Sequence, residues 1–251
     1  MNQNKSDNKS ILWITGFGLL TIILWNVPFG NLILYPFTIL GTWFHEMGHG
    51  LTAELLGGNF HQLVLFPDGS GYAQFSYDTL FLANFGKALV AAGGPLGPTI
   101  AGSIFIISSI NIKVTRIILL LFSLMLIVSL LIWVRPIISF GFGITGIFAL
   151  IFSFIAIKGK DGLKRGTLQF IGIQAIASLY QSIGYLYSQG GVIDGKEFKS
   201  DTQIIADNIW LPNWFAATVI LIFSIFTIYK SVQYVIKSNK IKTTTELTNF
   251  N

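Results

Sequence analysis

The chain has 251 residues, of which 52% are hydrophobic and only 11% are charged, and its mean hydropathy is +0.66. A soluble domain carries about 25% charged residues, so this composition excludes an ordinary soluble protein and predicts a polytopic membrane protein. The net charge of +5 is interpreted as loop lysines that meet anionic lipid, not as a nucleic-acid surface. The absence of cysteine excludes disulfides and thiolate metal ligands.

Several apolar segments reach or approach the ~20 residues that cross a bilayer as a helix. Residues 1–10 are predicted to be a disordered tail, residues 11–230 a single membrane domain, and residues 231–251 a polar, basic tail. The predicted fold is an all-α polytopic membrane protein with about seven transmembrane helices and a small β-hairpin inserted after the second helix. The predicted helices cover residues 11–27, 32–56, 80–110, 114–134, 136–157, 166–188 and 210–229.

The second predicted helix contains the sequence HEMGH, which holds two of the three histidines of the chain. At 3.6 residues per turn, His45 and His49 lie on one face of the helix and Glu46 about 100° further round. A zinc ion could bind both imidazoles, and Glu46 could then accept a proton from an activated water. Such residues are costly in an apolar helix unless they are coordinated, paired or hydrated. The alternative is therefore a set of hydrogen bonds across a helix bundle.

After Gly57 and Gly58, which end this helix, apolar residues alternate on both sides of the turn sequence PDGSG. The pattern predicts a β-hairpin at about residues 59–77, at the membrane surface beside the metal helix. Its free edge could pair with an extended peptide, although a surface turn that only connects two helices is an equally good interpretation. His61 is interpreted as a surface residue and Asp68 as a turn residue.

The third predicted helix contains the sequence AAGGPLGP. Small residues allow helices to approach closely in lipid, and the prolines interrupt the backbone hydrogen bonds of the helix. Gly93, Gly94 and Pro95 are expected at about the depth of the two histidines, since a helix rises ~1.5 Å per residue. Two interpretations stay open: a wall of a substrate-binding groove, and a glycine-lined helix crossing.

HEMGH in a membrane helix, the hairpin after it and AAGGPLGP in the next helix together resemble the site-2 protease family of intramembrane zinc metalloproteases, specifically its shorter relatives. The resemblance is good over residues 32–102. It implies a membrane-embedded Zn²⁺ with His45 and His49 as ligands, Glu46 as the catalytic acid and base, and cleavage of a membrane-associated polypeptide. The sequence departs from the better-known members, which carry an asparagine shortly after the glycine-proline pair, where this chain reads LGP after Pro95.

A zinc ion with two histidine ligands needs one more protein ligand and an open position. The loop after the sixth predicted helix offers three aspartates, Asp194, Asp201 and Asp207. Asp201 is preferred because SDTQIIAD resembles the acidic position of the shorter relatives. Asp194 is the alternative because its IDG sequence is similar to the aspartate-glycine element of well-known members. Asp201 is also typical of an acidic helix N-terminus that binds no metal.

The sequence therefore predicts a zinc metalloendopeptidase that hydrolyses peptide bonds of membrane-associated polypeptides, with the lipid bilayer as its other partner. Two further classes stay open: an ion-coupled transporter, and a metal-free scaffold that binds membrane partners through the hairpin. Seven spans would put the termini on opposite sides of the membrane. The distribution of Lys and Arg then favours a cytoplasmic C-terminus.

Overall fold

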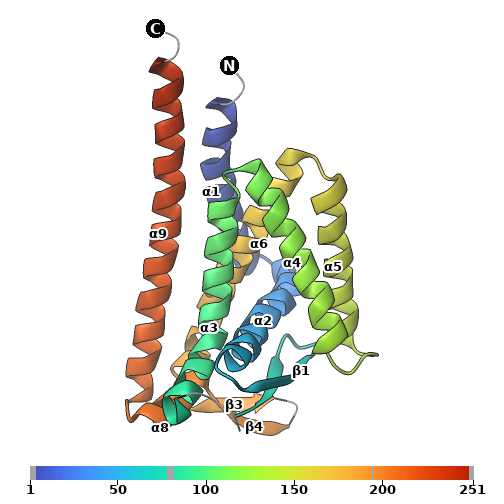
Figure 1. The fold of residues 1–251 in the computed structure, drawn as a ribbon, viewed down its shortest axis with the longest axis vertical. Coiled ribbons are helices and arrows are strands. Elements are labelled where there is room, and N and C mark those ends of the chain that lie inside the picture. Colours follow the sequence, from blue (N-terminus) through green and yellow to red (C-terminus); the bar gives the residue numbers. More distant parts are fainter. Residues whose placement is uncertain (1–3, 78–81, 194, 249–251) are drawn as a thin grey trace.

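The structure is a computed structural model and describes residues 4–77, 82–193 and 195–248. Most of its helices run alongside one another in a bundle, and two small hairpins lie at one end of this bundle (Figure 1). The described elements are, in chain order, α1 (Asn4–Asn26), α2 (Gly30–Leu55), β1 (Asn59–Leu65), β2 (Gly71–Ser76), α3 (Ala83–Ser108), α4 (Ile112–Ile132), α5 (Phe140–Lys158), α6 (Asp161–Gln181), α7 (Ile183–Leu186), β3 (Gly190–Ile193), β4 (Lys196–Lys199), α8 (Asp201–Ile209) and α9 (Asn213–Thr248).

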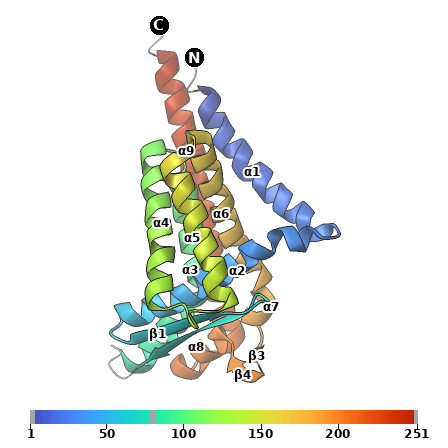
Figure 2. The ribbon, with the colours of Figure 1, turned by 90° about the vertical axis from the view of Figure 1, so that its right-hand side faces the viewer.

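The first two helices are joined by a sharp bend. α1 and α2 differ in direction by 118°, and Figure 2 shows α2 running across the bundle near the end that carries the hairpins. Pro28, in the connection, cannot donate a backbone hydrogen bond and so favours the end of α1. Gly30 allows the turn to be tight, because a Cβ at this position would collide with the carbonyl group of Leu24.

The number of spans is lower than predicted. Among the described residues, four helices are long and apolar enough to cross a membrane, or five if the bent pair α1 and α2 is one span. The prediction of about seven spans is therefore not confirmed. It counted α1 and α2 as two crossings. It also counted α6, which begins with charged residues and carries the buried polar side chains Gln169 and Gln174.

The first and last described helices reach the same end of the bundle, where α1 begins and α9 ends (Figure 1). α1 begins at Asn4, inside the segment predicted to be disordered, and α9 continues to Thr248, inside the predicted polar tail. Neither polar extension contains Pro or Gly. Each further residue can therefore add a hydrogen bond to a helix that the apolar segment has already nucleated.

The predicted hairpin is confirmed. β1 and β2 pair antiparallel, with Leu63 opposite Ala73. Leu63 N donates to Trp133 O at 2.8 Å, and Leu63 O accepts from Arg135 N at 3.0 Å, so one edge of β1 is covered. Because Leu63 directs these groups away from β2, Ala73 directs its own N–H and C=O away from β1. Among the described residues, no strand pairs with this outer edge of β2.

A second hairpin, which the sequence analysis did not predict, consists of β3 and β4. Its Phe198 stacks on Tyr72 of β2 with 6.0 Å between ring centroids and 22° between ring planes. This contact places the second hairpin beside the first. The Asp-Gly pair at 194–195, between two short runs, is a known hairpin signal that could have revealed it.

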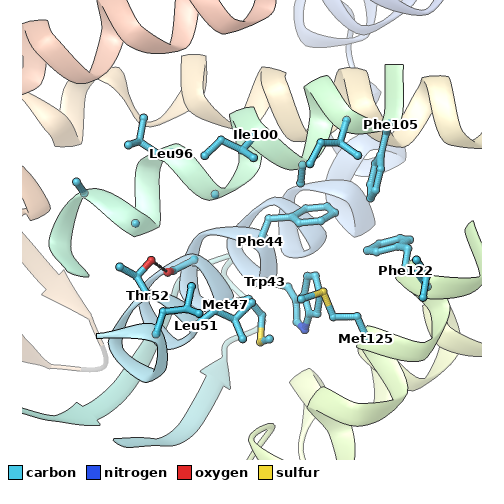
Figure 3. Close-up of a pocket in the computed structure, with 18 of the residues that line it drawn as sticks. Trp43, Phe44, Met47, Leu51, Thr52, Leu96, Ile100, Phe105, Phe122 and Met125 are labelled. Atoms are coloured by element: carbon cyan, nitrogen blue, oxygen red, sulfur yellow. Dashed lines mark hydrogen bonds between the residues drawn. The ribbon is translucent and has the colours of Figure 1, made fainter. Parts of the chain in front are cut away.

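An apolar groove of about 600 Å³ lies between α2, α3 and α4 (Figure 3). Met47, Leu51, Ile100 and Met125 are among its walls. Thr52 also lines it, but its hydroxyl already donates to Gly48 O at 2.7 Å. None of the described side chains that line the groove is titratable. The groove therefore has no group that could bind a metal or transfer a proton, and the candidate site lies elsewhere.

Candidate metal centre

Two histidines of α2 and one aspartate of α8 converge on a single point. His45 Nε2 lies 3.1 Å from Asp201 Oδ2, and His49 Nε2 lies 3.1 Å from Asp201 Oδ1. The two Nε2 atoms are 3.2 Å apart. The helical spacing of the histidines brings their rings together, as the sequence predicted, and the fold brings in Asp201 from a distant segment. Within the described part of the chain, these three residues form a group that could hold a metal ion.

The separations fit a zinc ion. A tetrahedral ion with bonds of ~2.0–2.1 Å holds its ligand atoms about 3.3 Å apart, close to the separations observed here. The two imidazoles approach different oxygens of the carboxylate, so both rings and both oxygens face the same small space. Asp201 Oδ2 is buried and has no hydrogen-bond donor directed at it, although His45 Nε2 is near. Two imidazole nitrogens and a carboxylate are a donor set that zinc accepts with one position open.

The position of the ring proton of His49 also suits a metal ligand. Its Nδ1 lies 2.8 Å from the carbonyl oxygen of Val90 in α3. A carbonyl oxygen only accepts, so Nδ1 carries the proton and Nε2 of the neutral ring keeps its lone pair. This second contact fixes the orientation of the ring, as is usual for histidines that bind metal. Nothing in the sequence pointed to Val90.

The three residues predicted to bind substrate lie in different surroundings. A Cβ at Gly94 would collide with Nε2 of His49, so this glycine leaves room for the ligand rings. A Cβ at Gly93 would collide with Thr52 Oγ1, which places Gly93 in the crossing of α2 and α3. Pro95 lines a cavity together with the two neighbouring residues His45 and Glu46 of α2.

Glu46 lies beside the three ligand candidates and is only 8% exposed. The backbone amide of Ala73 faces its carboxylate. That amide belongs to the free edge of β2. The side chain of Glu46 is therefore next to the ligands without being one of them, and it contacts the strand that could pair with a peptide.

Hydrogen bonds on both sides of Asp201 hold the start of α8. Ser200 Oγ donates to Ser188 O at 2.6 Å. Asn213, at the start of α9, donates from Nδ2 to Ser188 O and to Thr202 Oγ1, both at 2.9 Å. The side chain of Asn213 thus connects three segments around the aspartate. Asn213 was not predicted from the sequence, because an asparagine at a helix start does not by itself indicate a metal site.

Replacing Asn213 by alanine should weaken zinc binding about 10- to 100-fold, the usual effect of removing a group that positions a metal ligand. Without the Asn213 amide, the Thr202 hydroxyl no longer receives its hydrogen bond, and the start of α8 is held less firmly. Zinc affinity can be measured by competition with a chelator in detergent. Asn208→Ala is the control, since Asn208 Nδ2 donates only within α8, to Ile204 O at 2.8 Å. Equal affinity of the two variants would contradict the positioning role.

Electrostatics support an ionised aspartate and neutral tyrosines around the site. Burial alone would raise the pKa of Asp201, but the adjacent imidazoles of His49 and His45 lower it below its usual value. A bound cation would act in the same direction. Burial, and then the negative charge of Asp201, raise the pKa of Tyr77 and of Tyr185 above the usual value. Both hydroxyls therefore stay protonated at neutral pH and can donate hydrogen bonds.

The remaining acidic residues of α2 and α8 make contacts away from the metal centre. Asp207 pairs with Lys199 at 2.7 Å, where its pKa is lowered by this contact and by Gln203. Glu54 Oε1 accepts from Phe60 N at 2.7 Å at the start of the hairpin. His61 is exposed. Asp194, the alternative ligand, lies outside the described residues.

Two cavities meet at the metal centre. The first, of about 340 Å³, extends along α2, α6 and the turn of the first hairpin. The second, of about 230 Å³, extends between β2 and the second hairpin and reaches His49 and Asp201. His45, Glu46, Gly71 and Tyr185 line both. We call these four residues the neck.

A buried pair of histidines with an aspartate and an adjacent glutamate, set among apolar helices, defines a membrane protein with a hydrolase-type candidate metal centre. The chain matches the sequence profile of the family described as Peptidase M50B-like over residues 13–231. It belongs to this family, which confirms the predicted relationship to the site-2 proteases and supports a membrane-embedded protease. Comparisons with curated proteins and with solved structures found no match.

Proposed function

We propose that the protein is a zinc metalloendopeptidase that cleaves membrane-associated polypeptides within or at the bilayer. The observation that carries this proposal is the cluster of His45, His49 and Asp201 beside the carboxylate of Glu46. The two Nε2 atoms lie 3.2 Å apart, and each lies 3.1 Å from one oxygen of the Asp201 carboxylate. These three side chains would hold the ion and leave one position open. When bound, zinc would supply Lewis-acid activation of a water molecule and of the scissile carbonyl.

Glu46 would act as the general base and then as the general acid. Its carboxylate would accept a proton from the attacking water and pass it to the leaving amine. Two features support this role: its place in the neck, where any peptide that extends from one cavity into the other must pass, and its burial, which shields proton transfer from bulk water.

The free edge of β2 would bind the substrate as an added strand. Its outward amide at Ala73 and, by the alternation of the strand, the one at Gly71 border the second cavity. Proteolysis requires an extended chain at the scissile bond, and backbone pairing of this kind holds one. An added strand would also compete with Glu46 for the Ala73 amide. Binding of the substrate strand would then also free the Glu46 carboxylate from the Ala73 amide.

The experiment that tests the proposal is metal removal from the detergent-purified protein. Wild type should contain about one zinc ion per chain and should cleave a reporter with a single membrane anchor. A chelator should abolish cleavage, and added zinc should restore it, because the donor set of the site has no substitute for the ion. Full cleavage by metal-free protein would refute the proposal. Ion movement across vesicles without cleavage would instead favour a transporter.

We also propose that the end with the chain termini faces the cytoplasm, which puts the hairpins and the metal centre on the opposite side. The α3–α4 and α5–α6 connections lie at the same end as the beginning of α1 and the end of α9 (Figure 1). Basic residues concentrate there, as expected for the cytoplasmic side. They include Lys5, Lys9, Lys113, Arg116, Lys158, Lys160, Lys164, Arg165 and Lys237.

The natural absence of cysteine gives a direct test of this orientation. A membrane-impermeant maleimide should label Gln74→Cys, in the first hairpin, from outside intact cells. It should label Lys160→Cys, between α5 and α6, only after the membrane is opened, because the bilayer blocks the charged reagent. Both native side chains are exposed. The reverse labelling pattern would show that the orientation is inverted.

A further inference from the structure

The neck is the place where a scissile bond would lie. A peptide that occupies both cavities passes between the α2 residues His45 and Glu46, Gly71 of β2, and Tyr185 of α7. The ligand and the base are both on α2. The carbonyl oxygen of the bond under attack therefore has two possible neighbours besides the metal helix, namely the edge of β2 and the side chain of Tyr185.

Tyr185 is the neck residue whose side chain has no function in the mechanism described so far. His45 is a ligand candidate, Glu46 is the base of the proposed function, and Gly71 has no side chain. The Tyr185 hydroxyl donates to Lys199 O at 3.2 Å. An O–H···O hydrogen bond is usually 2.5–3.0 Å long, so this one is weak and can be exchanged for a better acceptor at little cost.

We propose that Tyr185 donates a hydrogen bond to the carbonyl oxygen of the scissile peptide bond as that oxygen becomes negatively charged. The inference rests on the proposed function and names a further catalytic residue for it. In the step concerned, the water oxygen forms a bond to the carbonyl carbon and the π electron pair moves onto the oxygen. Glu46 takes the water proton. The electron pair then returns, the C–N bond breaks, and the amine nitrogen takes the proton from Glu46.

The electrostatic surroundings keep the phenol ready to donate. Burial, followed by the charges of Asp201 and Glu46, raises the pKa of Tyr185 above its usual value of ~10. The hydroxyl is therefore protonated throughout the neutral range. A neutral donor next to two acids stabilises new negative charge without attracting a permanent anion into the cleft. Such preorganised donors typically contribute ~10²- to 10³-fold to kcat.

The other donors near the cleft are less well placed. Tyr77 lines only the second cavity, and Ser182 lines only the first. Ser182 Oγ already donates to Leu179 O at 2.9 Å. Lys199 also lines only the second cavity, and its ammonium group is bound to Asp207 at 2.7 Å. Among the described residues, Tyr185 is the side-chain donor that borders both cavities.

The test compares Tyr185→Phe with Tyr187→Phe in the zinc-loaded protein. Tyr185→Phe should lower kcat for the reporter ~10²- to 10³-fold, with KM changed little and zinc content unchanged, because the lost contact forms mainly in the transition state. Tyr187 lies two residues away, but its hydroxyl meets Thr218 Oγ1 at 3.0 Å and lines neither cavity. Its Phe variant should cleave like wild type.

Binding gives a readout that does not need turnover. A phosphinic peptide has a tetrahedral, anionic centre in place of the scissile bond, and should bind Tyr185→Phe more weakly than wild type by a factor similar to the loss in kcat. The unmodified peptide should bind Glu46→Gln equally well with or without the Tyr185 change. A structure of wild type with the phosphinic peptide should place the Tyr185 hydroxyl 2.5–3.0 Å from a phosphinyl oxygen.

Several results would overturn the proposed role of Tyr185. If wild type binds zinc and cleaves the reporter while Tyr185→Phe keeps its kcat and its affinity for the phosphinic peptide, this inference fails and the proposed function stands. The inference also fails if Tyr185→Phe loses zinc, since its role is then structural, or if Tyr77→Phe alone shows the predicted losses. If wild type neither binds zinc nor cleaves, the proposed function fails and this inference fails with it.

Discussion

Replacing Glu46 by glutamine should abolish cleavage and leave zinc in place. The amide has almost the same size and can still accept the Ala73 amide hydrogen, but it cannot take a proton from water. General acid-base catalysis contributes ~10²- to 10⁴-fold, and Glu46 is proposed to act in both directions, so the loss should lie at the upper end of this range. Cleavage of the membrane-anchored reporter and zinc content should be measured on the same preparation.

Glu54→Gln is the matched control for this prediction. Glu54 lies on the same helix, but its carboxylate accepts from Phe60 N at the start of the hairpin. A glutamine oxygen can accept the same hydrogen bond, so cleavage should stay close to that of wild type. Similar activity of the Glu46 and Glu54 variants would remove Glu46 from the mechanism.

Asp201→Ala should lose zinc. The change removes one of the three proposed protein ligands and leaves two imidazoles in a buried site, so affinity should fall by more than the ~10–100-fold that is typical for groups outside the ligand set. Cleavage should fall with it. Zinc content after dialysis and zinc affinity by chelator competition measure the effect, and circular dichroism should show that the helices remain.

Asp207→Ala is the matched control, because Asp207 lies on the same helix but pairs with Lys199 at the surface. This variant should keep zinc. Asp194→Ala tests the alternative ligand suggested by sequence. If Asp201→Ala retains zinc and Asp194→Ala loses it, the third ligand is Asp194 and not Asp201.

The local part of the site could be predicted from sequence. His45, Glu46 and His49 lie within five residues of one helix, and helical geometry alone sets their directions. The first hairpin was also predictable, because alternation of side chains and a turn sequence are local signals. Gly94 was noticed for its sequence neighbours. Its place against His49 Nε2 became visible only when α2 and α3 were packed.

The distant part of the site could not be predicted in the same way. Asp201 was chosen by resemblance, since no spacing rule connects α8 to a helix some 150 residues earlier in the chain. Val90, which orients His49, contributes only a backbone carbonyl, and any residue type offers that group. Asn213 acts through residues that flank a ligand. Contacts of this kind depend on tertiary packing.

The span count failed for a related reason. Hydropathy identifies segments that are apolar enough for lipid, but it does not give their directions. The bend of 118° after α1 turns α2 across the bundle, so the two apolar segments count as at most one span. The prediction also placed the termini on opposite sides, whereas α1 begins and α9 ends at the same end of the bundle (Figure 1). Pro28 and Gly30 indicate a break between the two helices. The angle of the bend depends on how α2 packs against the other helices.

The course of α2 matters for a reaction that consumes water. Because α2 crosses the bundle near the hairpins, the candidate centre lies toward one end of the bundle (Figure 2). The side chain of His45 retains 18% of its accessible surface and lines both cavities. If that end of the bundle lies at the membrane surface, water can reach the centre directly from the interface. The centre would then reach only those polypeptides whose helix frays at the same surface.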